Sequence, residues 1–194
     1  MLKQVWLNIQ FEFEVFCLEI IIDSPMQPTL FKQKVKVNHS VQGYLSADKF
    51  YHLALGKHSF KCKFGTSIVS LNEDEKLDGK RYWLVNLQRD NGVKEQIGSM
   101  IMDSKVSDTI RDNASFYQVN FKNNHYTMKK PFMQFGKEEA FLYDSNDLLL
   151  ANIFSSYKQK PRLKKCIYLN DNIEFNEEKI AFFIVSLNLA IFVS

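Results

Sequence analysis

The sequence has few of the residues from which several common functional sites are built. Seven glycines, four prolines and three cysteines occur in 194 residues. Glycine lets a backbone approach a phosphate closely, so this content leaves little material for a nucleotide-binding loop. The sequence also has no GxGxxG, Walker A, GxSxG or HExxH motif. The same scarcity of glycine and proline excludes collagen-like and linker-like chains.

Cysteines and histidines are also sparse. Cys17, Cys62 and Cys166 are far apart, and an odd, scattered set without a CxxC pair makes a poor disulfide framework. This usage favours a reducing compartment, so the expected location is cytoplasmic. The four histidines form no HxH or HxxxH pair. The sequence therefore predicts neither a metal site nor a cofactor.

Charge of one sign is not in large excess. Lys and Arg total 25 and Asp and Glu total 22, which gives a formal net charge of +3. A nucleic-acid-binding domain usually carries a larger basic excess gathered on one face. We therefore expect no nucleic-acid partner. Hydrophobic residues make up 45% of the chain and include seventeen phenylalanines, which is ample for the core of one domain.

Long hydrophobic runs are absent except at residues 180–193. The only polar residues in this run are Ser186 and Asn188. At about 100° per residue they point roughly 200° apart, so a helix here has no polar face and must be enclosed. The run spans about 21 Å as a helix. This is too short to cross a bilayer, for which a helix needs ~20 residues. It predicts a buried core helix at about residues 177–193, where two glutamates complement the start of the helix dipole.

Upstream of this helix, short alternating segments are separated by turn residues. The expected strands are residues 31–37, 59–64, 68–71, 81–89, 93–102, 116–122, 125–129, 140–143, 148–154 and 166–169. Hairpin turns are expected at Asn91-Gly92, at Asn123-Asn124 and in residues 144–147. Ten or more strands followed by one helix predict a mainly β protein, a closed antiparallel β-barrel that encloses the hydrophobic C-terminal helix.

The N-terminal segment has a different pattern. Residues 5–15 alternate between apolar and polar side chains, as in a half-buried strand. Asp23, Ser24 and Pro25 then interrupt the pattern. We therefore expect a peripheral, strand-like segment at residues 1–25 and a barrel domain at residues 26–194.

Part of the sequence resembles a known superfamily. Residues 180–192 (IAFFIVSLNLAIF) resemble the terminal helix of tubby C-terminal domains, and residues 171–175 (DNIEF) resemble the segment before that helix in phospholipid scramblases. Residues 141–153 (FLYDSNDLLLANI) are similar to a hairpin unit of LURP-one-related proteins. The chain departs from the tubby and scramblase patterns at Asn188, where those families carry Asp. It also lacks the Pro-rich and Cys-rich N-terminal segments of scramblases.

The resemblance implies a tubby C-terminal-like barrel of about twelve strands around the helix. It also implies two kinds of membrane function. Tubby domains bind phosphoinositides, and scramblases are membrane-associated.

A basic segment is the main candidate for a binding site. It contains one tyrosine and five basic residues between two expected strands: Tyr157, Lys158, Lys160, Arg162, Lys164 and Lys165. Lys129 and Lys130 precede Pro131 in another expected loop. If the two loops lie at one end of the barrel, they form a cationic surface suited to anionic phospholipid head groups. The alternative is a solvated loop without a ligand.

The acidic residues are expected to be structural. Asp144 and Asp147 fall in a predicted hairpin turn, where Asp is favoured for backbone reasons. Asp171, Asn172 and Glu174 supply oxygen atoms of the kind that calcium prefers, but they lack EF-hand spacing. A helix cap with exposed acids is the expected role of this segment. Nothing nominates a nucleophile or a general base, so we expect no enzyme activity.

The expected function is therefore that of a non-catalytic module. Its favoured partner is an anionic membrane surface. The protein is expected to be a monomer that is cytoplasmic or peripheral to the membrane. A protein-interaction or inhibitor module that uses hairpin tips such as residues 90–92 is the first alternative. A scramblase-like membrane-associated protein is the second.

Overall fold

The computed structural model describes residues 16–24, 32–47, 57–89, 92–103, 113–132, 137–156, 163–170, 174 and 176–193. The expected strand at residues 5–15 lies outside these ranges. Within them the chain forms twelve strands and then one long helix, α4 (Glu177–Phe192). The strands are β1 (Phe16–Ser24), β2 (Gln33–Val37), β3 (Ser40–Ala47), β4 (Ser59–Phe64), β5 (Ser67–Glu73), β6 (Tyr82–Gln88), β7 (Lys94–Met102), β8 (Ala114–Phe121), β9 (Asn124–Pro131), β10 (Lys137–Tyr143), β11 (Leu149–Ser156) and β12 (Leu163–Asn170).

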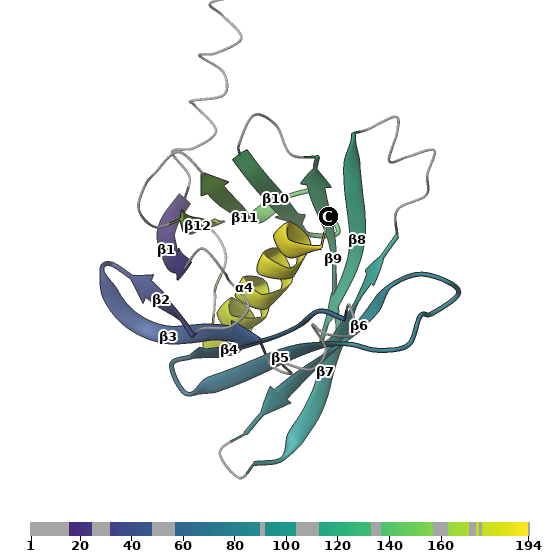
Figure 1. Ribbon diagram of the computed structural model, residues 1–194, viewed down its shortest axis with the longest axis horizontal. Helices are drawn as coiled ribbons and strands as arrows, with labels where there is room; N and C mark the ends of the chain where they lie inside the picture. The colour runs from purple at the N-terminus through teal and green to yellow at the C-terminus, as the bar shows by residue number, and fades with distance from the viewer. Residues whose placement is uncertain are drawn as a thin grey trace, which may run out of the picture.

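The twelve strands form a closed antiparallel barrel. Each strand pairs with its neighbours in the sequence, and β1 pairs with β12. Closure leaves no unpaired sheet edge among these strands. Figure 1 shows the ring of strands around the yellow helix α4. This confirms the fold class expected from the sequence.

The barrel closes through β1, which pairs with β12 on one side and β2 on the other. Ile20 and Ile22 are fully buried in the core. Part of the segment expected to be peripheral, residues 1–25, is therefore a barrel strand from Phe16 onward. The strand is needed because β2 and β12 would otherwise each present an open edge. The inward residues Ile20 and Ile22 are at even positions, so the alternation of β1 is out of step with the one at the odd positions of residues 5–15.

Most expected hairpins are present, with one difference in register. In the β8–β9 hairpin, Phe121 pairs with Asn124, so the turn is formed by Lys122 and Asn123 rather than by Asn123 and Asn124. Lys122 has a positive φ of 53°. The cross-strand packing of buried Val119 and Tyr126 fixes this register, because a one-residue slip would move both side chains to the solvent face.

Helix α4 fills the interior. Twelve consecutive residues, from Ile180 to Ile191, are buried. Phe182 stacks on Phe121 of β8 with ring centroids 4.4 Å apart. The helix is apolar on all sides because strands surround it on all sides. Among the described residues, no helix is long and apolar enough to span a membrane.

The two ends of the barrel are named here by the ends of the helix. At the Glu177 end, Asn176 caps the helix by accepting a hydrogen bond from the N–H of Lys179 at 2.8 Å. Glu177 accepts bonds from the N–H and the hydroxyl of Thr66, both at 2.8 Å. Gly65 allows this approach, since a Cβ on it would lie 2.2 Å from the Glu177 carboxyl group. The opposite end, where Val193 follows the helix, is the Val193 end.

Candidate functional site

The described strand ends that flank the predicted basic residues lie at the Val193 end. The hydrogen bond from Tyr117, near the start of β8, to the carbonyl of Val193 fixes which strand ends meet there. In an antiparallel barrel, β9 and β11 therefore finish at this end, and β10 and β12 begin there. The ends of β9 and β11 flank β10, so they are two strand spacings apart, about 10 Å.

The predicted basic segment is only partly described. Tyr157, Lys158, Lys160 and Arg162 lie outside the described residues, as do Asp171 and Asn172. Lys164 belongs to β12, where its Cα is opposite those of Asp23 and Ser156. Lys165 is the one member of the set whose side chain is described.

Lys165 points into the barrel instead of toward solvent. Its side chain is buried, and its Nζ donates a hydrogen bond of 2.6 Å to Oδ1 of Asn188 on α4. The expectation that Lys165 contributes to an exposed cationic surface is therefore corrected. The ammonium instead satisfies one of the two polar side chains in the helix interior. It also brings positive charge near the C-terminal part of α4, whose last turn has no basic residue of its own.

Lys129 and Lys130 also differ from expectation, since both belong to strand β9 rather than to a loop. Lys130 is buried on the inward face next to Ser115, its cross-strand partner. The Lys129 ammonium lies 5.7 Å from the centre of the Phe116 ring, in cation–π geometry. Of the two, only Lys129 is on the outward face, and exposed Phe132 follows at the end of the strand.

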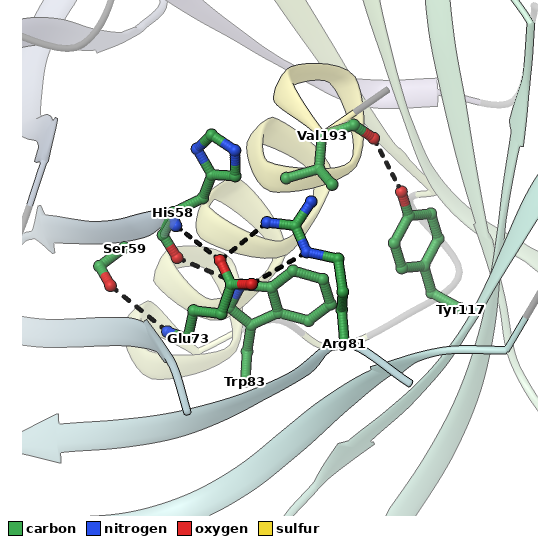
Figure 2. A network of polar contacts seen from close by, with 7 residues as sticks. All are labelled: His58, Ser59, Glu73, Arg81, Trp83, Tyr117 and Val193. Carbon is green, nitrogen blue, oxygen red and sulfur yellow. Dashed lines mark hydrogen bonds and ion pairs between the residues drawn. The ribbon is translucent and has the colours of Figure 1, made fainter. Parts of the chain in front are cut away.

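A cluster of polar side chains closes this end beside the helix (Figure 2). Nε and Nη2 of Arg81 donate to the two carboxylate oxygens of Glu73 at 2.9 and 2.8 Å. The backbone N–H of His58 donates to the same carboxylate at 2.6 Å. The Trp83 indole donates to the carbonyl of His58 at 3.1 Å, and the Arg81 guanidinium lies 5.2 Å from the Trp83 ring centre.

The cluster perturbs two pKa values. Burial raises the pKa of the Glu73 carboxyl, but the hydrogen bonds from Arg81 and from the His58 N–H outweigh burial, so the net pKa is lowered. Burial lowers the pKa of His58, the charge of Arg81 lowers it further, and Glu73 opposes both. At neutral pH the cluster therefore holds an ionised carboxylate and a neutral imidazole.

The cluster anchors the helix end. The His58 ring packs edge-on against Phe192 at 5.1 Å, and Phe60 does so at 5.4 Å. Nδ1 of His58 is buried and has no hydrogen-bond partner among the residues that the structure describes. Glu73 is held by Arg81 and by a backbone N–H. This geometry holds the helix end in place.

No metal site is built by the described side chains. Across the described ranges, no three His, Cys, Asp or Glu side chains gather closely enough to share a metal ion. Asp144 instead fixes its hairpin turn, since its Oδ1 accepts from the N–H groups of Asn146 and Leu148 at 2.8 and 2.9 Å. The turn role expected for Asp144 is thus confirmed.

The sequence contains an alternating pattern from which the inward orientation of Lys165 can be predicted. Lys165 shares its strand face with Ile167 and Leu169, and all three are buried. Side chains two residues apart lie on the same face of a strand, so this alternation separates Lys165 from Lys164. The cluster of His58, Glu73 and Arg81 has no such pattern, because its members come from different segments.

Comparisons with known proteins add no assignment. No family model, curated protein or solved structure matches the chain. The resemblance to tubby C-terminal-like barrels therefore stays an expectation from the sequence.

Proposed function

We propose that this barrel is a non-catalytic module that binds anionic phospholipid head groups through basic residues at its Val193 end. The contact residues are Lys158, Lys160, Arg162 and Lys164, with Tyr157 beside them. Lys165 is excluded from the contact because it bonds to Asn188 inside the barrel.

One observation carries the proposal. The β11–β12 connection, which contains three basic residues, begins and ends at the same barrel end as the end of β9. Outward-facing Lys129 and exposed Phe132 stand on β9 and just after it. A cationic surface with an aromatic residue at its rim suits a membrane interface, where apolar and polar groups meet.

The expected strength of the interaction follows from simple electrostatics. Each basic residue near an anionic membrane contributes about 1 kcal/mol. Neutralising one residue should therefore weaken binding about fivefold. The contribution should fall as salt rises, because mobile ions screen charges beyond about 10 Å at 0.1 M.

Vesicle co-sedimentation tests the proposal. The protein is mixed with vesicles of neutral phosphatidylcholine, with vesicles that also contain phosphatidylserine, and with vesicles that contain a phosphoinositide. We expect binding to the two anionic compositions, and we expect added salt to weaken it. Absence of binding to both at low salt would reject the proposal.

A pair of double variants separates this surface from overall charge. Lys158→Gln/Lys160→Gln should weaken vesicle binding more than tenfold, since two contributions are lost. Lys63→Gln/Lys94→Gln removes the same charge from exposed side chains near the Glu177 end and should leave binding within about twofold. Equal losses in the two variants would show non-specific charge attraction instead of a defined surface.

A further inference from the structure

Positive charge is concentrated on the wall of the barrel formed by β2, β3 and β4, which lie side by side in Figure 1. The described residues 32–47 and 57–64, which make up this wall, contain no aspartate or glutamate. They contain six lysines: Lys32, Lys34, Lys36, Lys57, Lys61 and Lys63. The whole chain has a net charge of only +3, so the remaining residues together carry a net negative charge. The small overall excess therefore conceals a strongly basic region.

Three side chains on the outer face of this wall form a row across the strands. Tyr44 of β3 lies opposite Lys34 of β2 on one side and opposite Lys63 of β4 on the other. All three side chains are exposed, that of Tyr44 to 41%. The next residues along β2 and β3, Val35 and Leu45, are buried in the core, as alternation along a strand requires. The row therefore presents an aromatic ring between two ammonium groups on the outside of the barrel.

Two other lysines of the wall have neighbours on the adjoining strands. The Lys36 ammonium lies 2.5 Å from a carboxylate oxygen of Asp23 on β1, so its charge is partly compensated. The Lys61 ammonium donates a hydrogen bond of 3.2 Å to Oε1 of Gln88 on β6. This amide is neutral and leaves the positive charge of Lys61 in place. The surface around Tyr44 therefore keeps an excess of positive charge, which attracts an anionic partner.

A single-stranded nucleic acid matches both features of the row. Its bases can stack on an exposed tyrosine ring, and its phosphates can pair with lysines. Lys34 and Lys63 are two strand spacings apart, about 10 Å at their Cα atoms, so their long side chains can reach the phosphates on both sides of a base that stacks on Tyr44.

Other anionic partners fit the row less well. The bases of a duplex stack on each other and leave no free face for the ring. An acidic peptide would pair with the lysines and leave the ring without a role. A planar membrane would touch only a narrow strip of the convex wall, whereas a flexible strand can follow it.

From this arrangement we infer that the wall formed by β2, β3 and β4 is a binding surface for single-stranded RNA or DNA. Tyr44 stacks on one base, and Lys34 and Lys63 bind the flanking phosphates. Binding of this type depends little on sequence, because each contact is made to a group that all nucleotides share. The surface uses residues other than those of the proposed lipid contact. It also replaces the expectation of no nucleic-acid partner, which rested on the net charge of the whole chain.

Fluorescence anisotropy on the full chain tests the class of partner. The probes are labelled oligo(U) and oligo(dT) of about 12 nucleotides, a DNA duplex of the same length and a glutamate peptide of similar charge. We expect both single strands to bind at least about tenfold more tightly than the duplex and the peptide, since only the single strands offer unstacked bases. Tighter binding of one single strand would identify the preferred nucleic acid. No binding of either single strand at about 50 mM salt, or equal binding of the duplex or the peptide, would overturn the inference.

Two variants with matched controls locate the contact. Tyr44→Thr removes the ring from a strand position that threonine tolerates well and should weaken oligo(dT) binding about tenfold. Tyr44→Phe keeps the ring and should leave binding within about twofold. Lys34→Gln/Lys63→Gln should weaken binding and reduce the slope of log K against log salt by about 1.4, since two phosphate contacts are lost. Lys76→Gln/Lys94→Gln removes the same charge from exposed residues outside the wall and should leave the slope unchanged.

Three results would contradict the assigned surface. The first is an equal effect of the two Tyr44 variants, and the second is an equal effect of the two lysine double variants. The third is a loss of phosphatidylserine-vesicle binding in Lys34→Gln/Lys63→Gln as large as its loss of oligonucleotide binding, which would assign the wall to a membrane. Far-ultraviolet circular dichroism confirms that each variant is folded.

Discussion

The barrel holds the two ends of its helix in different ways. At the Glu177 end, Glu177 binds the exposed Thr66 and Glu178 binds Lys122 at 2.7 Å, in a pair whose side chains are 25% and 48% exposed. At the Val193 end the bond between Lys165 and Asn188 is buried, and Glu73 and Arg81 form a half-buried pair whose side chains are 11% and 27% exposed. Exposed pairs contribute little to stability, whereas breaking a buried one leaves a desolvated group without a partner. We therefore expect the Val193 end to account for most of the polar contribution to helix anchoring.

The largest loss is expected at the buried bond between Lys165 and Asn188. Asn188→Leu keeps the side-chain size and removes the acceptor, so it should lower the free energy of unfolding by about 2–3 kcal/mol. Urea unfolding followed by tryptophan fluorescence measures the change.

A double-mutant cycle shows whether the effect belongs to this bond. Lys165→Met/Asn188→Leu should be less destabilised than the sum of its two single variants, since no charge is left buried without its acceptor. Additive losses would mean that the two side chains do not depend on each other. Lys165→Met should also leave vesicle binding unchanged in the folded fraction.

A smaller loss is expected at the carboxylate that joins β5 to Arg81. Glu73→Gln removes the charge-assisted bonds to the guanidinium and should cost about 1.5–2 kcal/mol. Glu75→Gln, at an exposed position two residues later, should change stability by less than about 0.5 kcal/mol. Thermal unfolding of the two variants makes the comparison, and similar midpoints would remove Glu73 from the anchoring cluster.

The titration of His58 in the same cluster should make the stability of the protein depend on pH. Because the folded-state pKa of His58 lies below its ordinary 6.5, the unfolded chain takes up the proton first as pH falls. The stability that the lowered pKa of His58 gives is fully present above about pH 7 and is lost as the pH falls toward the folded-state pKa. Over this range the free energy of unfolding should change by less than about 1.4 kcal/mol per pH unit. His58→Phe keeps the ring contact with Phe192 and should flatten the dependence between pH 7.5 and 5.5.

The loss of stability at lower pH should come from the Glu73 carboxylate. The lowered pKa of Glu73 gives stability that is present above its ordinary 4.5 and is lost as pH falls below that value. This second loss should persist in His58→Phe and shrink in Glu73→Gln. An unchanged profile in both variants would place the acid-sensitive groups elsewhere.

The smallest effect is expected at the Glu177 end. Glu178→Gln removes an exposed pair with Lys122 and should cost about 0.3–0.5 kcal/mol at low salt. The difference should disappear at about 1 M salt, where screening is strong. A loss as large as that of Asn188→Leu, measured under the same urea conditions, would reverse the ranking of the two ends.

Much of the fold was accessible from the sequence because local pattern determined it. The apolar run at residues 180–193 predicted α4 to within a residue at its C-terminal end, and alternation predicted most strands. The role of β1 was not predicted, because closure depends on pairing between the first and last strands of the barrel.

The candidate sites were less accessible, for a similar reason. A count of basic residues grouped Lys164 with Lys165, although strand geometry turns Lys165 inward toward Asn188. The cluster of His58, Glu73 and Arg81 joins three segments that are adjacent only after folding. Contacts between distant segments of this kind leave no periodic pattern in a sequence.

The order of elements along the chain has a consequence for synthesis. The helix that occupies the lumen follows all twelve strands, and its contacts reach back 76 residues to Tyr117 and 111 residues to Thr66. A ribosome therefore releases the entire wall before it releases the residues that fill it. Until then the inward apolar faces have no partner, a situation that slows folding and favours aggregation.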